Sequence, residues 1–254
     1  MTYDELCALL EERYPLEIQE EWDRSGPELA PASDGEGITG VLIGLTLTMG
    51  MIERAEALGV NLILCHHPLF FNEEQPSDLT NFKNSQLLEA MAARGIGFYA
   101  LHTNFDKLEM NKALGDLLEL EDREVLDEVS GIGIVGTMRE SLTVRELALQ
   151  LKDLLGRSRI PFTRGTEGLQ VARVAVCGGS GKDLLDLAMC KGEVYLTGDV
   201  NYHCFEKSSY FNFPVLDIGH HHSEVVGMSR LARLLDQELP FPVVFDEEED
   251  FSVI

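Results

Sequence analysis

Short apolar runs alternate with helical patterns along the first part of the chain, and this alternation is the feature that most constrains the fold. The runs at 41–47, 62–65 and 96–101 are typical of buried strands. The segments 51–59 and 84–95 carry apolar residues at helical spacing, and each ends at a glycine that favours a helix stop. Strands that alternate with helices in this way favour a mostly parallel sheet with helices on both of its faces.

The same alternation resumes in the second half of the chain. Strand and helix patterns recur there in seven segments: strands at 131–138, 171–179, 193–198, 214–219 and 241–245, and helices at 144–156 and 229–239. Two segments interrupt the alternation. The acidic segment 118–131 predicts a hinge, and the segment 25–38, rich in glycine, proline and acidic residues, predicts a loop.

These patterns predict an α/β fold made of two α/β domains with mixed, mostly parallel sheets. We place the first domain at 1–125 and the second at 126–239, on either side of the interruption in the pattern. The terminal segment 240–254 contains a further strand, and its return to the first domain is left open.

The charge of the chain argues against two classes of partner. Asp and Glu number 44 against 20 Lys and Arg, which gives a formal net charge of −24. Non-specific nucleic-acid binding depends on basic side chains that neutralise phosphates, so it is disfavoured here. Adhesion to an anionic membrane surface is disfavoured for the same reason.

The sequence also predicts a cytoplasmic location. The N-terminal segment is acidic where a signal peptide would be basic, and no apolar run approaches the roughly 18 residues that a membrane span needs. The five cysteines are scattered along the chain without a C-x-x-C pair. Such spacing favours neither structural disulfides nor a cysteine-type zinc site.

Two glycine-rich motifs resemble nucleotide-binding loops but lie in the wrong context. Gly131, Gly133 and Gly136 spell G-x-G-x-x-G, yet the motif follows an acidic segment and lies within a strand pattern, whereas a dinucleotide fingerprint opens a helix. Gly181-Lys182 lacks the first glycine and the following Ser or Thr of a phosphate-binding loop. We interpret the second segment as a tight strand-to-helix turn that needs glycine.

All the histidines lie at or shortly after the ends of predicted strands. In a parallel sheet, the carboxyl ends of the strands meet at one edge, where loops converge to form a site. Carboxylates follow or precede the imidazoles, and this combination is typical of a metal site with mixed nitrogen and oxygen ligands. The seven histidines are His66, His67, His102, His203, His220, His221 and His222.

Each group also has an ordinary structural interpretation. His66 and His67 are equally consistent with a surface pair at a strand end, and the histidines at 220–222 with an exposed tract. Asp106 is suited to capping a helix and Glu224 to the first turn of one. The coincidence of all the histidines at four strand ends favours the metal site over these separate explanations.

Six blocks of the sequence, taken together, resemble the GTP cyclohydrolase I type 2 family, also called NIF-three-like proteins. The blocks are EEWDRSG (20–26), HHPLFF (66–71), YALHTNFD (99–106), AVCGGSG (175–181), TGDVNYH (197–203) and GHHHSE (219–224). The resemblance covers nearly the whole chain and implies a short form of the family without an inserted domain. It further implies two α/β domains with a two-metal site in the cleft between them, and assembly into a hexameric ring.

The resemblance also assigns roles to individual residues. The implied metal ligands are His66, His67, Asp106, His220 and Glu224, with Glu224 as the bridge between two metals. His102 and His203 are implied as neighbouring groups that transfer protons, whereas His221 and His222 are not ligands. The chain departs from the family at 44–46, where it reads Gly-Leu-Thr in a strand that carries an aspartate in many members.

These assignments predict a dinuclear metal-dependent hydrolase. Two divalent ions can activate a water molecule and polarise the bond that it attacks, and the ligand set suits Zn, Mn, Fe, Ni or Co. The family label implies a small-molecule substrate such as the nucleotide GTP, with opening of its purine ring. One alternative is a metal-binding carrier or regulatory interaction protein without turnover. Another is a structural protein that the metals only stiffen.

Overall fold

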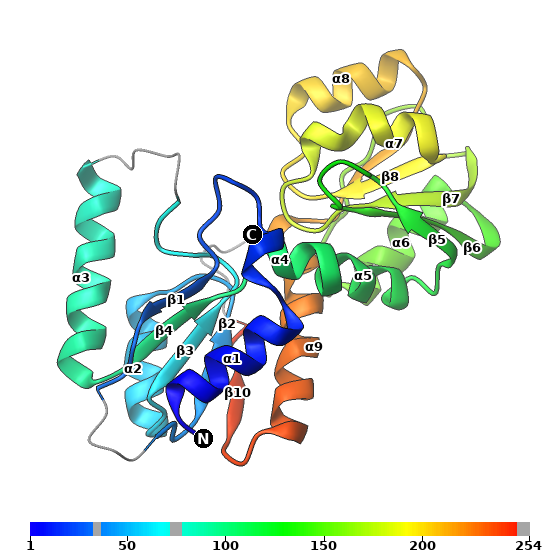
Figure 1. Ribbon diagram of the computed structural model, residues 1–254. Helices are drawn as coiled ribbons and strands as arrows, with labels where there is room; N and C mark the ends of the chain where they lie inside the picture. Colours follow the sequence, from blue (N-terminus) through cyan, green and yellow to red (C-terminus); the bar gives the residue numbers. More distant parts are fainter. Residues whose placement is uncertain (33–36, 72–77, 248–254) are drawn as a thin grey trace. The chain divides into compact units, whose positions relative to one another are not determined.

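The computed structural model describes residues 1–32, 37–71 and 78–247, and the chain forms two compact units. The first unit comprises Met1–Phe105 together with the chain from Met228 onward, and the second comprises Asp106–Gly227 (Figure 1). Across the described residues, none of the helices combines the length and the apolar character that crossing a membrane requires.

The first unit is organised around a five-stranded mixed sheet. Its strands are β1 (Gly26–Leu29), β2 (Val41–Gly44), β3 (Leu62–Cys65), β4 (Gly97–Ala100) and β10 (Val243–Phe245). They lie in the order β1-β4-β3-β2-β10. All neighbours are parallel except β1, which pairs antiparallel with β4 at one edge. The carboxyl ends of β2, β3 and β4 therefore lie at the same edge of the sheet.

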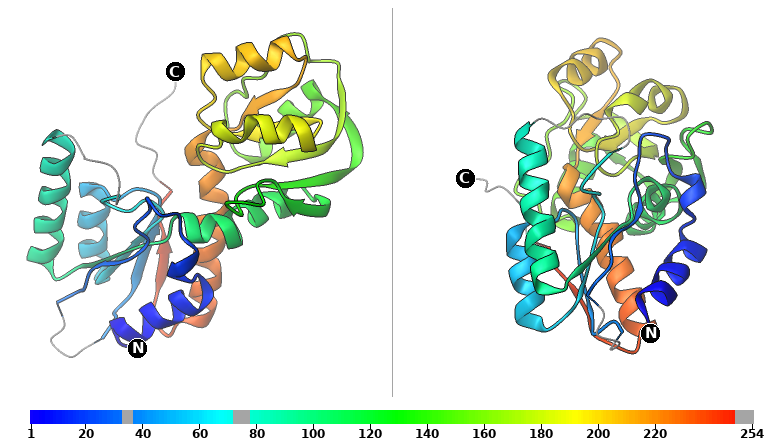
Figure 2. Two further views of the ribbon diagram at one scale, coloured as in Figure 1. Left: turned by 45° about the horizontal axis from the view of Figure 1, so that its top comes forward. Right: turned by 60° about the vertical axis from the view of Figure 1, so that its left-hand side comes forward.

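Helices cover both faces of this sheet. They are α1 (Tyr3–Arg13), α2 (Met49–Leu58), α3 (Asp78–Arg94) and α9 (His220–Glu238), with the short turns η1 (Leu16–Ile18) and α4 (Thr103–Phe105). Figures 1 and 2 show α2 and α3 on one face and α1 on the other. An ion pair of 2.7 Å between Arg13 and Glu238 joins α1 to the end of α9. All three central strands are fully buried, as continuous apolar runs between two helical layers require.

The second unit has a five-stranded sheet of its own. The strands are β5 (Glu121–Val125), β6 (Ile134–Thr143), β7 (Gln170–Val176), β8 (Val194–Thr197) and β9 (Val215–Asp217), in that order. The first three pair antiparallel, and β7, β8 and β9 are parallel. The carboxyl ends of these last three strands again share one edge.

Two apolar layers flank the second sheet. Its helical segments are η2 (Asp106–Met110, a π-helical turn), α5 (Asn111–Leu117), α6 (Val144–Leu154), η3 (Lys182–Leu184), α7 (Leu185–Lys191) and α8 (Tyr202–Tyr210). Buried residues of α5 and α6 pack on one face of the strands, and those of α7 pack on the other (Figure 1). Successive residues of β7 alternate between the two layers, because side chains of a strand point to opposite faces.

The prediction of an α/β fold with mixed sheets is confirmed, two local predictions are wrong, and one predicted helix begins earlier than expected. The segment 25–38, expected to be a loop, contains β1, and the segment 118–131, expected to be a hinge, contains β5. Both are edge strands with few apolar residues, so they lack the periodic signal that marks a strand. The helix expected at 229–239 begins at His220, because its first turns carry histidines rather than an apolar stripe.

The packing of the second unit predicts a sharp contrast between two leucine substitutions. Leu216 is completely buried in β9, so Leu216→Ala is expected to lower the free energy of unfolding by about 2–5 kcal/mol. Leu149 lies on α6 with 56% of its surface exposed, and Leu149→Ala should change it by about 0.5 kcal/mol or less. Urea unfolding followed by circular dichroism measures both. Equal losses would contradict the assignment of the buried face.

Candidate metal centre

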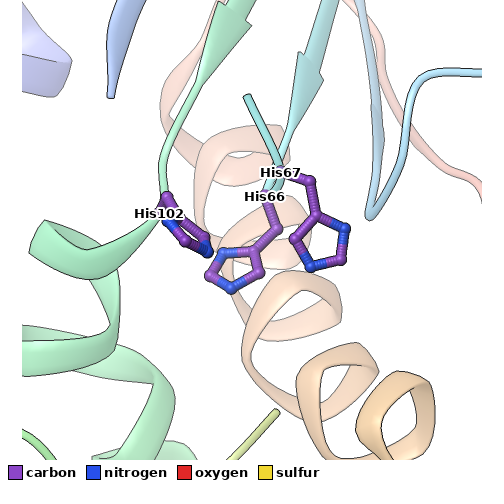
Figure 3. A group of neighbouring side chains, drawn as sticks. All are labelled: His66, His67 and His102. Atoms are coloured by element: carbon purple, nitrogen blue, oxygen red, sulfur yellow. The ribbon is translucent and has the colours of Figure 1, made fainter. Parts of the chain in front are cut away.

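Three histidines gather at one edge of the first sheet. His66 and His67 follow β3 directly, and His102 comes two residues after β4. The ring centroids lie 5.1 Å apart for His66 and His67, 5.0 Å for His66 and His102, and 5.9 Å for His67 and His102. One nitrogen from each ring lies within 4.8 Å of the others, and Figure 3 shows the rings turned toward one another. At this spacing, His66 and His67 can hold a metal ion with His102 beside it.

Backbone hydrogen bonds beyond the strands hold these segments together. The amide of His66 donates to the carbonyl of Gly44 at 3.2 Å, and the amide of His67 donates to Leu45 at 2.9 Å. On the other side, the amide of Leu101 donates to the carbonyl of Cys65 at 2.9 Å. The parallel pairing thus continues past the ends of the strands and fixes the backbone that carries the imidazoles.

The Nδ1 atoms of His66 and His102 are each held by an acceptor. Nδ1 of buried His66 lies 2.7 Å from the carbonyl oxygen of Leu101, and Nδ1 of His102 lies 3.0 Å from Oδ1 of Asp23. A carbonyl or a carboxylate only accepts hydrogen bonds, so in the neutral imidazole the proton resides on Nδ1 and Nε2 keeps its lone pair. Metal-binding histidines are oriented in the same way by their outer partners.

His67 has a different kind of partner. Its Nδ1 lies 2.8 Å from Oγ1 of Thr46, which follows β2. A hydroxyl group can donate as well as accept, so Thr46 orients the ring without selecting one tautomer. The segment 44–46, where the chain departs from the family sequence, therefore contacts one of the predicted ligands.

An aromatic pair lies beside the histidines. The ring centroid of Trp22 is 5.7 Å from that of His102, and the ring of Phe71 is 5.6 Å from His102. The two aromatic rings are 5.8 Å apart, and Trp22 is 38% exposed. Trp22 is the single tryptophan of the chain, which makes its fluorescence a reporter for this site.

A second group of donors lies in the second unit. His220 is the first residue of α9 and Glu224 lies one helical turn later, so both side chains are on the same face of the helix. Nε2 of His220 is 3.0 Å from Oε1 of Glu224, and Nδ1 is 2.8 Å from Oδ2 of Asp199. The hydrogen bond to Glu224, reinforced by the charges of both carboxylates, outweighs burial and raises the pKa of His220 to about 9. The imidazole of His220 is thus protonated at neutral pH in the absence of a metal.

The glycine turn at 178–181 packs against Glu224. Gly179 has a positive φ of +63°, and a Cβ atom at this position would lie 2.4 Å from Oε1 of Glu224. Its amide donates to Oγ of Ser223 at 2.9 Å. Glycine at 179 is therefore required by the close approach of a carboxylate, rather than by a bound phosphate.

Asp106 lies close to this turn. It begins η2, and its carbonyl accepts a hydrogen bond of 3.0 Å from Asn111, whose own Oδ1 accepts from the amide of Gly178. Burial raises the pKa of the Cys177 thiol well above its usual range, and the negative charges of Asp106 and Glu224 add to this effect. Cys177 therefore remains a neutral thiol at neutral pH.

The structure places the remaining histidines differently. His203 lies on α8 with its side chain 84% exposed and its Nδ1 3.2 Å from Glu206. It is not among the clustered metal donors found in the described part of the chain. The rings of His221 and His222 lie edge to face, with their centroids 5.7 Å apart.

Sequence reasoning missed the residues that orient the imidazoles. Asp23 and Thr46 belong to segments that carry no histidine, and their role depends on sheet register rather than on a local motif. The block at 20–26, which resembles the family, is the one signal that pointed toward Asp23.

Comparison with known proteins identifies the family. The family model of Duf34/NIF3 (NGG1p interacting factor 3) matches residues 1–250. The chain belongs to this family. The resemblance drawn from the sequence blocks is thereby confirmed.

Individual relatives align with this NIF3 family member along most of their length. A Clostridium perfringens protein named GTP cyclohydrolase 1 type 2 homolog is 27% identical over 267 residues, covering 100% of both chains. A protein of the same name from Lactococcus lactis is 33% identical over 227 residues, covering 87% of this chain and 84% of the relative. The crystal structure of a Staphylococcus aureus hypothetical protein shares the fold with a TM-score of 0.88 at 22% identity, covering 100% of this chain and 99% of the other.

The contact between the glycine turn and Glu224 predicts that one methyl group added at Gly179 strongly lowers the free energy of unfolding. Gly179→Ala is expected to lower the free energy of unfolding by more than the roughly 1–2 kcal/mol that a positive φ alone imposes on alanine, because Cβ also collides with the carboxylate. Gly156→Ala is the matched control, since Gly156 has a φ of +65° and nothing within 4 Å of the added atom. Urea unfolding of both variants separates backbone strain from collision. Equal losses would show that the turn adapts to the methyl group.

Proposed function

We propose that this NIF3 family member is a metal-dependent hydrolase. The proposed ligands of two divalent ions are His66, His67, Asp106, His220 and Glu224, with Glu224 as the bridge. The observation that carries the proposal is the hydrogen bonding of two imidazoles. Nδ1 of His66 and Nδ1 of His67 are each held by a neighbouring group, which leaves Nε2 of each ring available to a metal ion.

The proposed centre supplies hydrolytic chemistry. Divalent ions bound by nitrogen and carboxylate donors activate water and polarise the bond under attack. Among the residues of the chain, His102 is proposed to carry the proton, because its Nδ1 is hydrogen-bonded to Asp23 and its side chain is only 13% exposed. His203 is proposed as a second proton carrier on the strength of the family resemblance alone.

We propose a nucleotide as the substrate class, with GTP and opening of its purine ring as the first candidate. The names of the relatives support this choice. Trp22 and Phe71 support it as well, because their faces beside His102 offer a surface on which a planar heterocycle can stack. The same resemblance supports a cytoplasmic hexameric ring.

The charge of the chain favours a second candidate, a metal carrier or regulatory metal-binding protein without turnover. A net charge of −24 attracts cations and repels a triphosphate. In this case the site would bind and release metal ions, and His102 would have no catalytic part. The two candidates differ in whether a substrate is consumed.

Metal content and fluorescence test the proposed ligand set. Protein purified without chelators or a histidine tag is expected to hold about two metal ions per chain, and Glu224→Ala should lose at least one. Co²⁺ added to the metal-free protein should quench Trp22, whose ring lies 5.7 Å from His102. His66→Ala should weaken this binding at least about 10-fold, because outer partners of metal ligands alone contribute about 10–100-fold.

His203→Ala is the control for these measurements, since its exposed side chain is outside the proposed ligand set. It should retain the metal content and the Co²⁺ affinity of the wild type. Substoichiometric metal that neither Zn²⁺ nor Mn²⁺ restores, with no change in Glu224→Ala, would rule out the two-metal centre.

A substrate screen that includes GTP distinguishes the hydrolase from the carrier. For the substrate that is turned over, His102→Ala should lower kcat about 10²–10⁴-fold, the range expected for loss of a proton-transfer group, while metal content stays unchanged. His221→Ala should keep kcat near the wild-type value. Rapid metal exchange with a chelator, without turnover of any substrate, would favour the carrier.

A further inference from the structure

A buried carboxylate lies behind the histidine cluster, outside the proposed ligand set. Asp23 is completely buried in the segment that precedes β1. It accepts hydrogen bonds from the amide of Arg24 at 2.6 Å and the hydroxyl of Ser25 at 3.1 Å. It also accepts from the amide of Thr103 at 2.9 Å and from the hydroxyl of the same residue. The imidazole of His102 lies 3.0 Å from the same carboxylate.

The sheet register explains how Asp23 reaches His102, although 79 positions separate them in the sequence. Gly26 at the start of β1 pairs with Ala100 at the end of β4. Because the two strands are antiparallel, the chain just before β1 runs alongside the chain just after β4. The reversed edge strand thus brings an acid to the edge where the carboxyl ends of the parallel strands lie.

His102 is held at both its backbone and its ring. Its amide donates to Oγ of Ser25 at 3.1 Å, while Nδ1 faces Oδ1 of Asp23. Burial by itself raises the pKa of Asp23, but the hydrogen bonds from His102 and Thr103, together with the positive charge of His102 when it is protonated, outweigh burial and hold this pKa well below its usual range. The carboxylate therefore stays ionised at neutral pH and can only accept hydrogen bonds.

We infer that Asp23 is a positioning residue, which fixes the neutral imidazole of His102 with its proton on Nδ1 and with Nε2 directed toward His66 and His67. Asp23 acts through His102 and needs no contact with a substrate. The use of His102 in proton transfer rests on the proposed function, whereas the tautomer itself is a property of the metal-free protein.

Asparagine at position 23 separates this role from a purely structural one. Asp23→Asn has almost the same shape and still offers one oxygen that accepts from Ser25 or Thr103. Its amide group, however, can donate to Nδ1 of His102, which favours the tautomer with the proton on Nε2. In the triad of serine proteases, the same replacement leaves the geometry intact and yields the wrong tautomer.

The test is nuclear magnetic resonance of the metal-free protein labelled with ¹⁵N in histidine only. Long-range ¹H–¹⁵N correlation distinguishes protonated from unprotonated ring nitrogens, and His102→Gln assigns the resonances of His102. In the neutral imidazole of the wild type, Nδ1 of His102 should be protonated and Nε2 unprotonated. In Asp23→Asn this pattern should be lost, with Nε2 protonated in a substantial fraction of molecules.

Two controls keep the result specific. The resonances of His66, whose Nδ1 faces the carbonyl of Leu101, should not change in Asp23→Asn if the fold is intact. Ser25→Ala removes one hydrogen bond to Asp23 and the acceptor of the His102 amide, but it leaves the carboxylate against Nδ1 of His102, so it should keep the wild-type tautomer.

Two outcomes would overturn the inference. One is a wild-type His102 with its proton on Nε2, which needs no variant to be seen. The other is an unchanged His102 pattern in a folded Asp23→Asn. Absence of turnover with every substrate would contradict the proposed hydrolase and leave the tautomer result unaffected.

Discussion

The pairing of three parallel strands is the constraint on which the candidate site in the first unit depends. Because β2, β3 and β4 run in the same direction, Thr46, His66 and His102 all emerge at one edge of the sheet. Backbone hydrogen bonds past the strand ends then fix the segments that carry them. The antiparallel β1 adds a residue from before its own start to the same edge. Short segments at the ends of β2, β3 and β4 and before β1 thereby meet at one edge of the sheet.

The second unit arrives at a related arrangement by other means. There the imidazole and a carboxylate lie one turn apart on a single helix, and a loop after β8 supplies Asp199 against Nδ1 of His220. Asp199 has a φ of +54°, a region that non-glycine residues rarely occupy. Strain of this kind persists where the surroundings over-determine it, and here it accompanies the hydrogen bond to a predicted ligand. In both units an aspartate thus holds Nδ1 of one histidine.

The sequence was sufficient for the features that have a periodic or local signature. Apolar runs predicted the buried strands β2, β3 and β4, and histidines at strand ends indicated where donors would meet. The edge strands β1 and β5 escaped prediction because β5 is exposed throughout and β1 has one buried residue, so neither carries an apolar alternation. The early start of α9 escaped it too, since polar residues fill its first turn. Asp23 is the clearest case, because only the register of β1 on β4 relates it to His102.

The electrostatics of the chain bear on what such a site can bind. A net charge of −24 means that carboxylates dominate the long-range field, so the chain attracts cations before any specific contact forms. Imidazoles add selectivity at short range, because nitrogen donors favour transition metals over the Ca²⁺ and Mg²⁺ that an acidic surface also draws in. A bound divalent ion would then reverse the local sign of the field. On this argument the acidic surface and an anionic substrate are compatible only when the metal is bound first, so metal loading would precede substrate binding.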